Sequence, residues 1–420
     1  MMPIPNRRTF LATSAAALAM APMLAAAEAV PPVRCAVAGT GGRGSDLIRK
    51  LADLAEAKLV AICDDYQPHL KYGAKYAGEG VPTYDSFDTM LAESKPEAVF
   101  VAVPLDLHYG MCVKALDAGA QAYCEKSLCH SLNDARDLAA RVKAAGAVFQ
   151  VGLQRRANPV YEQAAAMASS GMIGRVTAVK CQWHRNHPWR RDLPIGPEDP
   201  RHAALDRKLN WRLYDAFSRG LFTELGSHQM DVVNRILGTP PKRVWATGGI
   251  DYWRDGREAE DNVFCTYEYA MKDPAKPEEA PYTVRATWSA ILNNAFEGAS
   301  ELILGTKGSL LITRNKCLLY QEGAGVPDAA AGSGNPDGAD AVTSGKTLLV
   351  RTDPWEFRGE PTTFEIEGDD TRWAVRSFLQ HVQAKDANTI CNVDVGVENV
   401  APMLMAFESM RSGEAKGYPG

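Results

Sequence analysis

Short apolar runs alternate with longer amphipathic stretches in the first part of the chain. The runs have the length of buried strands and cover residues 34–39, 58–63, 98–103, 120–124 and 147–152. Between them, residues 45–55 and 111–118 show the spacing of apolar positions that is typical of helices. Strands that alternate with helices predict a parallel sheet covered on both faces, in a domain of residues 33–153.

The pattern changes after Gln154. A predicted helix over residues 159–169 is followed by longer strand-like runs at 175–183, 243–251, 263–269, 282–290 and 300–306. We therefore expect an α/β protein whose second domain, residues 154–420, is α+β and contains a large, mostly antiparallel sheet. Such a sheet face often serves for self-association, so we expect a homo-oligomer, a dimer or a tetramer. Helical patterns at 371–384 and 395–411 end the chain and are candidates to pack back on the first domain.

Two stretches have the composition of loops. Residues 272–281 are charged and rich in proline, and residues 323–345 consist largely of Ala, Gly, Asp and Ser. Neither has enough apolar side chains to form a core.

The N-terminus has the pattern of an export signal. Arg7 and Arg8 precede an apolar, alanine-rich run that ends in a small-x-small sequence, and adjacent arginines before Phe-Leu resemble a twin-arginine signal. We predict a signal peptide over residues 1–29, cleavage after Ala29 and a periplasmic protein without stable membrane insertion. The alternative is a single membrane anchor, which the alanine content and Pro22 disfavour.

Composition narrows the class of protein. The chain has 420 residues, 46% of them hydrophobic, and a formal net charge of −5, so it lacks the basic surface that nucleic-acid binding requires. Its nine cysteines are odd in number, several lie inside apolar runs, and none has the spacing of a zinc site. We assign no function to them.

A glycine-rich turn follows the first strand directly. Its residues, all predicted to bind a dinucleotide, are Gly39, Thr40, Gly41, Gly42, Arg43 and Gly44, which match GxGxxG between a strand and a helix. Asp64 ends the next strand, where a carboxylate accepts hydrogen bonds from an adenosine ribose. This carboxylate would repel a 2′-phosphate, so NAD is favoured. NADP remains possible if Arg43 binds that phosphate.

The next motifs resemble a known family. Val101-Ala-Val-Pro104 with His108, followed by Glu125-Lys126, is similar to the Thr-Pro-x-x-x-His and Glu-Lys-Pro elements of the Gfo/Idh/MocA oxidoreductases. The resemblance covers roughly residues 33–238, and this chain has Ser127 where the family usually has proline. It implies cofactor contacts from Pro104, His108, Glu125, Lys126 and Gln154. It also implies that Lys126 stabilises alkoxide character at the substrate oxygen.

A second catalytic candidate lies in the sequence from Gly220 to Asp231. If this segment is helical, Glu224, His228 and Asp231 lie on one face, so that a carboxylate can orient the imidazole as an acid/base. The family has an acid at the position of Glu224, commonly Asp. A purely structural histidine remains the alternative.

Aromatic and polar residues that suit a sugar pocket follow the first strand of the second domain. We place His184, Trp189, Arg190, Trp211 and Asp231 in a substrate site for a carbohydrate. The same region allows a metal site made of His184, His187, Glu224 and His228, but that alternative leaves Lys126 and the glycine motif unexplained. We therefore predict no metal.

These observations define a function. We expect an exported NAD(P)-dependent oxidoreductase that transfers a hydride between a sugar, polyol or glycoside hydroxyl and a tightly held nicotinamide cofactor, with Lys126 and His228 at the reacting centre. The periplasm has no metabolic pool for exchanging NAD, which is why the cofactor should be retained and recycled. A redox-neutral NAD-dependent glycoside hydrolase and a non-catalytic sugar-binding protein that retains the dinucleotide are the alternatives.

Overall fold

The computed structural model describes residues 30–273, 278–322 and 361–419. The predicted signal peptide and the predicted loop at 323–345 lie outside these residues. The chain divides into two units, Met1–Pro32 and Val33–Gly420, and the following description concerns the second.

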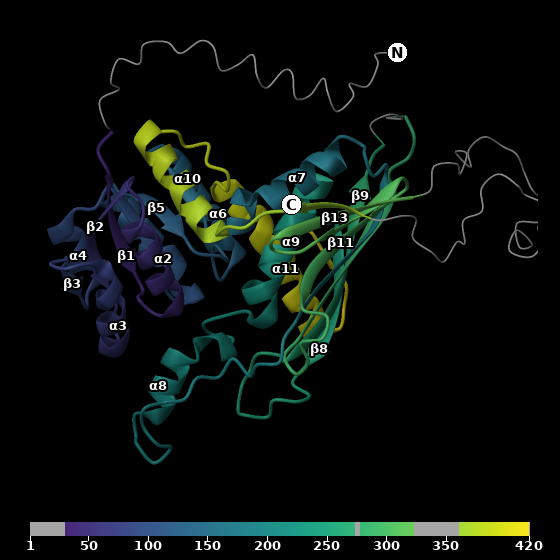
Figure 1. The fold of residues 1–420 in the computed structure, drawn as a ribbon. Coiled ribbons are helices and arrows are strands. Elements are labelled where there is room, and N and C mark those ends of the chain that lie inside the picture. Colours follow the sequence, from purple (N-terminus) through teal and green to yellow (C-terminus); the bar gives the residue numbers. More distant parts are fainter. Residues whose placement is uncertain (1–29, 274–277, 323–360, 420) are drawn as a thin grey trace, which may run out of the picture. The chain divides into compact units, whose positions relative to one another are not determined.

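A six-stranded parallel sheet forms the first half of this unit (Figure 1). Its strands are β1 (Val33–Ala38), β2 (Ala57–Cys63), β3 (Thr83–Tyr84), β4 (Ala98–Val101), β5 (Gln121–Cys124) and β6 (Phe149–Val151), in the order β3-β2-β1-β4-β5-β6. The helices between them are α2 (Gly42–Ala52), α3 (Gln67–Ala77), α4 (Phe87–Ser94), α5 (His108–Asp117) and α6 (Leu132–Ala145). This is the doubly wound arrangement that the sequence pattern predicts.

Both faces of this sheet are buried, which explains why its strands are apolar without alternation. Along β1, Cys35 and Val37 pack in one cluster with Leu47 of α2, while Ala36 and Ala38 pack in the cluster on the other face. Strand alternation thus directs successive side chains into two cores.

The second sheet has nine strands among the described residues. They are β7 (Val176–His184), β8 (Arg243–Gly249), β9 (Asn262–Met271), β10 (Tyr282–Ile291), β11 (Ala299–Gly305), β12 (Gly308–Ile312), β13 (Lys316–Gln321), β14 (Thr362–Glu365) and β15 (Lys416–Gly417), in the order β14-β13-β12-β11-β7-β10-β9-β8-β15. Neighbouring strands are antiparallel except for β7 and β10, which pair in parallel. The prediction of a mostly antiparallel sheet is confirmed.

Helices cover one face of the second sheet. The core there joins residues of the strands to α7 (Pro159–Ser169), α9 (Ser227–Leu237) and α11 (Val393–Ser412). On β9 the burial alternates, so that Val263 and Cys265 are buried while Phe264 is 49% exposed. Trp245 of β8 is also half exposed. The other face of the sheet therefore carries large apolar side chains in contact with solvent.

The two C-terminal helices connect the halves. Phe378 of α10 (Asp370–Ala384) makes edge contacts with the rings of Phe100 and Tyr123 in the first sheet. Helix α11 contacts α6 of the first half and β8 of the second. The two halves thus form one compact unit, although their buried apolar residues fall into separate clusters.

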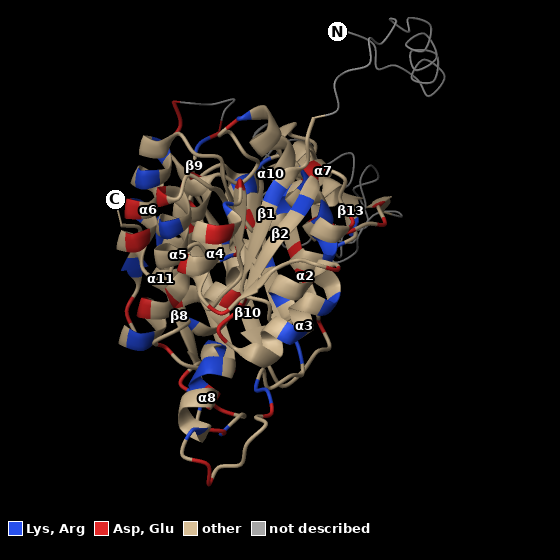
Figure 2. Ribbon diagram, turned by 90° about the vertical axis from the view of Figure 1, so that its left-hand side faces the viewer, with Lys and Arg blue, Asp and Glu red and all other residues tan. Residues whose placement is uncertain are grey.

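Charge and cysteine placement agree with a globular chain. Basic and acidic residues are interspersed over the helices in Figure 2. All nine cysteines are buried and free. Among the described residues, no helix has both the length and the apolar character that a membrane span needs.

Candidate active site

The glycine motif forms the turn between β1 and α2. Gly39 has φ = 84°, and a Cβ there would lie 2.4 Å from the carbonyl oxygen of Ala102. A Cβ on Gly44 would lie 1.7 Å from the Gly39 oxygen, so the third glycine lets the helix start close to the strand. Gly41 caps α2 without a side-chain hydrogen bond. The first N–H groups of α2 are therefore available for an anion.

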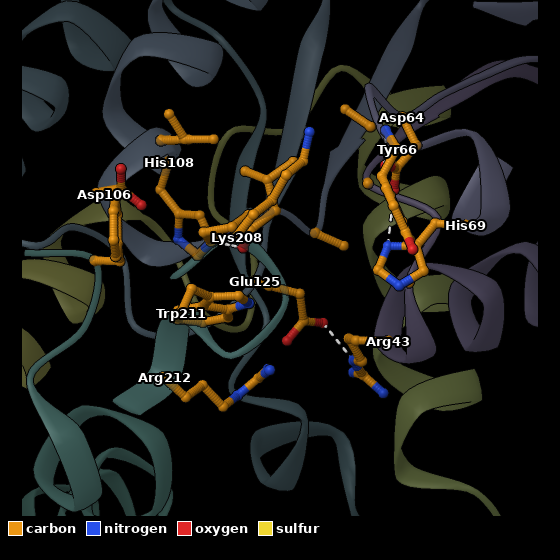
Figure 3. Close-up of a pocket in the computed structure, with 18 of the residues that line it drawn as sticks. Arg43, Asp64, Tyr66, His69, Asp106, His108, Glu125, Lys208, Trp211 and Arg212 are labelled. Atoms are coloured by element: carbon orange, nitrogen blue, oxygen red, sulfur yellow. Dashed lines mark hydrogen bonds and ion pairs between the residues drawn. The ribbon is translucent and has the colours of Figure 1, made fainter. Parts of the chain in front are cut away.

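Asp64 lies beside this turn at the end of β2. Its Oδ2 accepts a hydrogen bond from the Thr40 backbone N–H at 2.7 Å, and its Oδ1 accepts one from the Tyr66 N–H at 2.9 Å. His69 Nδ1 is 3.7 Å from Oδ2 (Figure 3). The carboxylate is thus fixed where a ribose would approach the turn.

Arg43 does not turn toward Asp64. Its Nε donates to Glu125 Oε1 at 2.8 Å, and its Nη1 donates to Asp46 and to Thr371. Burial opposes protonation, but the Glu125 carboxylate raises the pKa of Arg43 above its usual value. The structure therefore gives no support to the idea that Arg43 binds a 2′-phosphate.

Hydrogen bonds around Ser127 fix the backbone that carries Lys126. His108 is buried, with Nδ1 2.8 Å from the Ser127 oxygen and Nε2 3.1 Å from the Val103 oxygen. Ser127 Oγ donates to the Thr223 oxygen at 3.1 Å, and the Lys126–Ser127 peptide bond is cis. These bonds connect the end of β5 to the segment that contains Glu224.

Lys126 and Glu224 meet in the interior. Lys126 Nζ donates to the Glu224 backbone oxygen at 3.1 Å and is 3.5 Å from Glu224 Oε2, which also accepts from Arg212 Nε at 2.7 Å. Burial lowers the pKa of Lys126, and the nearby Arg212 guanidinium adds to this shift against the opposing effect of Glu224. Burial raises the pKa of Glu224, but Lys126 and Arg212 outweigh it and lower the value.

His228 is buried near these groups. Residues Phe222–Gly226 form a π-helical turn, and α9 begins at Ser227. No carboxylate orients the imidazole, because Nδ1 has no hydrogen-bond partner among the described residues. The prediction of a carboxylate-oriented histidine is corrected: Arg212 and Lys126 engage Glu224, and Arg156 binds Asp231. Burial, followed by the charge of Lys126, lowers the pKa of His228 well below its usual value.

A cavity of about 630 Å³ connects these elements. The predicted cofactor residues that line it are Gly39, Gly41, Gly42, Arg43, Asp64, Pro104, His108, Glu125, Lys126 and Gln154. The predicted catalytic residues Glu224 and His228 line it as well. Figure 3 shows His108 and Trp211 on one side of this pocket and Asp64 and His69 on the other, with Glu125 between them. Thr40 and Gly44 support the turn without lining the cavity.

A second cavity of about 530 Å³ lies against the first. It shares Lys126, Arg191, Arg212, Glu224 and His228 with the first cavity, and is otherwise lined by Trp183, Arg185, His187, Trp189, Arg190 and Leu225. The predicted catalytic residues therefore stand between a pocket on the glycine turn and a pocket on the second domain.

The predicted substrate residues fall in different places. Trp189 and Arg190 line the second cavity, whereas Trp211 lines the first. His184 lines neither, because its ring lies 2.9 Å from Ser289 Oγ and 3.0 Å from Glu297. Asp231 is 2% exposed and bonded to both nitrogens of the Arg156 fork. We therefore remove His184 and Asp231 from the substrate site.

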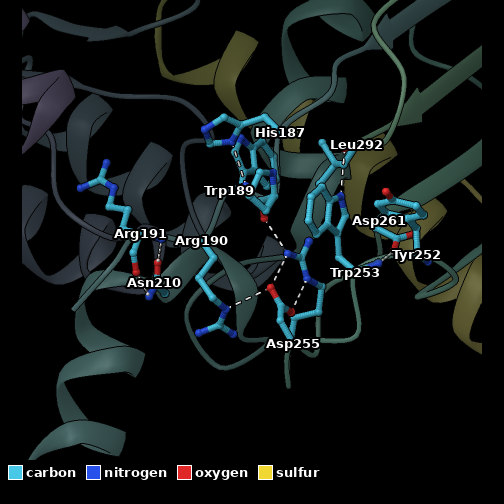
Figure 4. Close-up of polar contacts among 12 residues, drawn as sticks. His187, Trp189, Arg190, Arg191, Asn210, Tyr252, Trp253, Asp255, Asp261 and Leu292 are labelled. Atoms are coloured by element: carbon cyan, nitrogen blue, oxygen red, sulfur yellow. Dashed lines mark hydrogen bonds and ion pairs between the residues drawn. The ribbon is translucent and has the colours of Figure 1, made fainter. Parts of the chain in front are cut away.

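The predicted site residues do not include Arg185, Arg191, Lys208 or Arg212, although Arg185 and Arg191 lie in the aromatic and polar stretch that suits a sugar pocket. All four belong to the segment between β7 and the π-helical turn, which carries α8 (His202–Leu209). Figure 4 shows how this segment is held: Arg190 donates to Asp255, and the Asn210 side chain bonds the backbone of Arg191. The density of arginine beside tryptophan was the available signal, but spacing alone cannot show which arginines are already paired.

The described residues contain no group of three or more His, Cys, Asp or Glu side chains placed to hold a metal. In particular, His187 Nδ1 accepts a hydrogen bond from the Trp189 N–H, while His184 is engaged by Ser289.

The first cavity fits a dinucleotide. It joins a glycine turn, a helix N-terminus without a side-chain cap, and the Asp64 carboxylate, which two backbone N–H groups hold in place. Groups of these kinds bind a pyrophosphate and a ribose. Three buried polar atoms on its walls have no partner among the described residues: Gln154 Oε1, His228 Nδ1 and Arg43 Nη2. Its volume lies within the roughly 300–1,000 Å³ of ligand pockets.

Family models identify the class. Residues 33–153 match the model described as "Oxidoreductase family, NAD-binding Rossmann fold", and residues 166–417 match "Oxidoreductase family, C-terminal alpha/beta domain". The chain therefore belongs to the Gfo/Idh/MocA family of oxidoreductases, as the motifs around Pro104 and Lys126 predicted. The NAD-binding description agrees with the predicted cofactor.

Individual proteins show the same similarity. The chain is 32% identical over 215 residues to inositol 2-dehydrogenase 1 of Saccharopolyspora erythraea, a match that covers 50% of this chain and 56% of that protein. Matches to the first curated relatives likewise span about half of their length.

Two solved structures share the fold. The WlbA dehydrogenase from Bordetella pertussis, in complex with NADH and UDP-GlcNAcA, has a TM-score of 0.66 at 19% identity and covers 93% of this chain and 99% of its own. The aldose-aldose oxidoreductase from Caulobacter crescentus, complexed with glycerol, has a TM-score of 0.66 at 18% identity and covers 92% and 99%.

Proposed function

We propose that this protein is an exported oxidoreductase that transfers a hydride between a carbohydrate hydroxyl-bearing carbon and a tightly held NAD. One observation carries the proposal: Lys126 and His228 line both the cavity on the glycine turn and the cavity on the second domain. A substrate in the second cavity therefore meets the two groups at the boundary with the first.

NAD, when bound, supplies the acceptor for the hydride. The glycine turn and the N-terminus of α2 would hold its pyrophosphate, and Asp64 its adenosine ribose. Gln154 lines the same cavity, and its buried Oε1 has no hydrogen-bond partner among the described residues, so a small movement of the side chain would offer an acceptor for an amide N–H.

His228 is suited to accept the hydroxyl proton. Because its pKa is well below the usual value, the imidazole is neutral at neutral pH and has a free lone pair. Nδ1 is buried and has no hydrogen-bond partner among the described residues, so the other ring nitrogen, Nε2, is the one that we expect to meet the substrate.

Lys126 is suited to stabilise the oxygen as its proton leaves. The ammonium is held by the Glu224 oxygen atoms, and a buried cation interacts more strongly with a developing alkoxide than an exposed one. Its lowered pKa also eases proton return when the reaction runs toward reduction.

We infer export from the pattern of the N-terminal sequence. We propose a twin-arginine signal that carries the folded protein, with its nucleotide, to the periplasm. Replacing Arg7 and Arg8 together by lysine should retain the protein in the cytoplasm, as measured by cell fractionation. Equal periplasmic amounts for the variant and the native chain would contradict this route.

We also propose that the protein forms a homo-oligomer. The half-exposed Trp245 and Phe264 lie on neighbouring strands, on the sheet face that no helix of the described residues covers, which suits an interface between copies. Light scattering on a sizing column should give a dimer or tetramer, and replacing both residues by serine should lower the mass. A monomeric native protein would contradict the proposal.

The function is tested on the protein as purified. Mass spectrometry should detect co-purified NAD or NADH, and adding sugars, polyols and glycosides should produce the absorbance of reduced nicotinamide. Product analysis separates this reaction from the alternatives. An oxidised sugar supports oxidoreduction. A free sugar released from a glycoside, without net reduction of the nucleotide, supports the hydrolase. Retained nucleotide without any chemical change would favour the binding protein.

A further inference from the structure

The second cavity carries an excess of positive charge. Five cationic residues line it, namely Lys126, Arg185, Arg190, Arg191 and Arg212, against the single carboxylate of Glu224. A cavity that only bound neutral hydroxyl groups would not need this excess, because unpaired cations are costly to desolvate.

Three of the five cations have carboxylate partners. Arg190 is neutralised by Asp206 at 2.7 Å and Asp255 at 3.0 Å. Arg212 and Lys126 share Glu224, at 2.7 Å and 3.5 Å. The Glu224 carboxylate therefore balances two cations, and Arg185 and Arg191 have no carboxylate partner among the described residues.

The guanidinium groups of Arg185 and Arg191 make no hydrogen bond or ion pair within residues 30–273, 278–322 and 361–419. Arg191 faces the glycine turn: its Nη2 lies 3.9 Å from the position of a Cβ on Gly42, and it lines both cavities. Its natural partner is the pyrophosphate of the dinucleotide, which would bind at that turn.

Arg185 lines only the second cavity, so the pyrophosphate does not account for it. Two tryptophan rings hold its guanidinium: Cζ is 5.7 Å from the centre of the Trp183 ring and 5.6 Å from that of Trp189. Trp183 in turn lies 5.6 Å from the His228 ring. The two rings thus place the guanidinium near His228, and its N–H groups have no hydrogen-bond partner among the described residues.

We propose that the substrate of this site is an acidic sugar, whose carboxylate binds the N–H edge of Arg185 while its hydroxyl reaches Lys126 and His228. This rests on the proposed function, since it names the substrate class of the same site. A carboxylate matches the planar fork of a single guanidinium in a bidentate manner, and it balances the one charge that the protein leaves unpaired there.

The test compares sugars that differ in one group. Glucose with glucuronate, and galactose with galacturonate, are measured on the full chain as purified, by calorimetric Kd and, with an added artificial electron acceptor that reoxidises the bound nicotinamide, by kcat and KM. Glucose 6-phosphate tests whether any anion suffices. We expect kcat/KM about 10- to 100-fold higher for the acids than for their neutral counterparts, the range of a charge-assisted hydrogen bond.

Arg185→Gln should raise KM and Kd for the acids by the same factor, with a smaller effect on kcat, and Arg185→Lys should recover only part of the affinity. Arg175→Gln is the matched control, because Arg175 also lies over an aromatic ring, that of Tyr282, at 4.7 Å, but lines neither cavity. This control should leave the preference unchanged. If Arg185→Gln does not fold, the ratio of kcat/KM between the acids and their neutral counterparts in the native protein still tests the acidic substrate.

The outcomes separate the two proposals. Equal kcat/KM for acids and neutral sugars overturns the acidic substrate, and an acid preference that survives Arg185→Gln overturns the binding of its carboxylate by Arg185. Both results leave the oxidoreductase intact. A stronger preference for glucose 6-phosphate overturns the carboxylate in favour of a phosphate. Arg185-dependent binding of the acids without turnover supports the carboxylate site and counts against the oxidoreductase. Neither binding nor turnover of any sugar in the panel overturns both.

Discussion

Arg43 and Glu125 are joined by a 2.8 Å hydrogen bond between Nε and Oε1, which connects the glycine turn to the residue before Lys126. The pair couples the part of the site that would hold a pyrophosphate to the part that holds the reacting ammonium. A displacement of the glycine turn would therefore also displace Lys126, and a displacement of Lys126 would displace the turn.

Glu125→Ala tests this coupling. The Arg43 guanidinium would lose its nearest carboxylate in a largely buried place, so the free energy of unfolding should fall by about 1–3 kcal/mol. Turnover should fall as well, because Lys126 loses a positioned neighbour. Urea unfolding and steady-state rates measure both. Glu365→Ala is the control, since its pair with Lys316 is exposed. Equal losses in the two variants would contradict a special role for the Arg43–Glu125 pair.

The glycines of the turn should differ in what they support. A Cβ on Gly44 collides with the Gly39 oxygen, whereas a Cβ on Gly41 would meet only His69, at 3.5 Å. Gly44→Ala should therefore destabilise the fold by about 1–3 kcal/mol. Gly41→Ala should fold normally yet retain less nucleotide, because the added methyl group stands on the cavity wall. Thermal unfolding and quantification of bound nucleotide check this pair, and the reverse pattern would contradict it.

Asp64 should determine the choice of nucleotide. Its carboxylate is fixed by two backbone N–H groups and would repel a 2′-phosphate. In Asp64→Asn the share of NADP(H) among co-purified nucleotides should rise about tenfold, as quantified by mass spectrometry. Asp53→Asn, at the exposed end of α2, should keep the native ratio. An unchanged ratio in Asp64→Asn would show that another group discriminates.

The pH dependence of sugar oxidation should report His228 and Lys126. His228 accepts a proton only when neutral, and burial together with Lys126 holds its pKa well below 6.5, so activity should persist as pH falls through 6.5. Lys126 acts when charged, and its pKa is lowered from 10.5, so the alkaline loss should begin below that pH. Profiles of kcat/KM against pH measure both limbs. An acid limb centred at 6.5 or above would contradict the neutral, buried imidazole.

Much of the fold was predictable because its signals are local. The helix over 159–169 coincides with α7, and the apolar runs at 58–63 and 282–290 fall within β2 and β10. Strands β12, β13 and β14 were not recognised, since strands of five, six and four residues are too short to show a distinct periodicity. The start of α2 was placed at Ser45, although the helix begins at Gly42 within the glycine turn itself.

The candidate site was predictable only in part. The glycine turn, Asp64 and Lys126 follow from strand ends, because parallel strands direct their carboxyl ends to one edge. Which charged residues are paired depends on contacts between distant segments. Asp231 accepts a hydrogen bond from Arg156, 75 positions away, and His184 is hydrogen-bonded to Ser289. That Arg185 has no hydrogen-bond or ion-pair partner among the described residues can be seen only from the contacts of the folded chain.

The central claim is that a carbohydrate passes its hydride directly to a nucleotide held beside Lys126 and His228. Incubating the purified protein with sugars deuterated at their ring carbons, then extracting the nucleotide for mass spectrometry, measures that transfer. We predict reduced nicotinamide that carries one deuterium in the native protein, and the same bound nucleotide without deuterium in Lys126→Ala. Absence of deuterium in the native protein, or its undiminished presence in Lys126→Ala, would contradict the account.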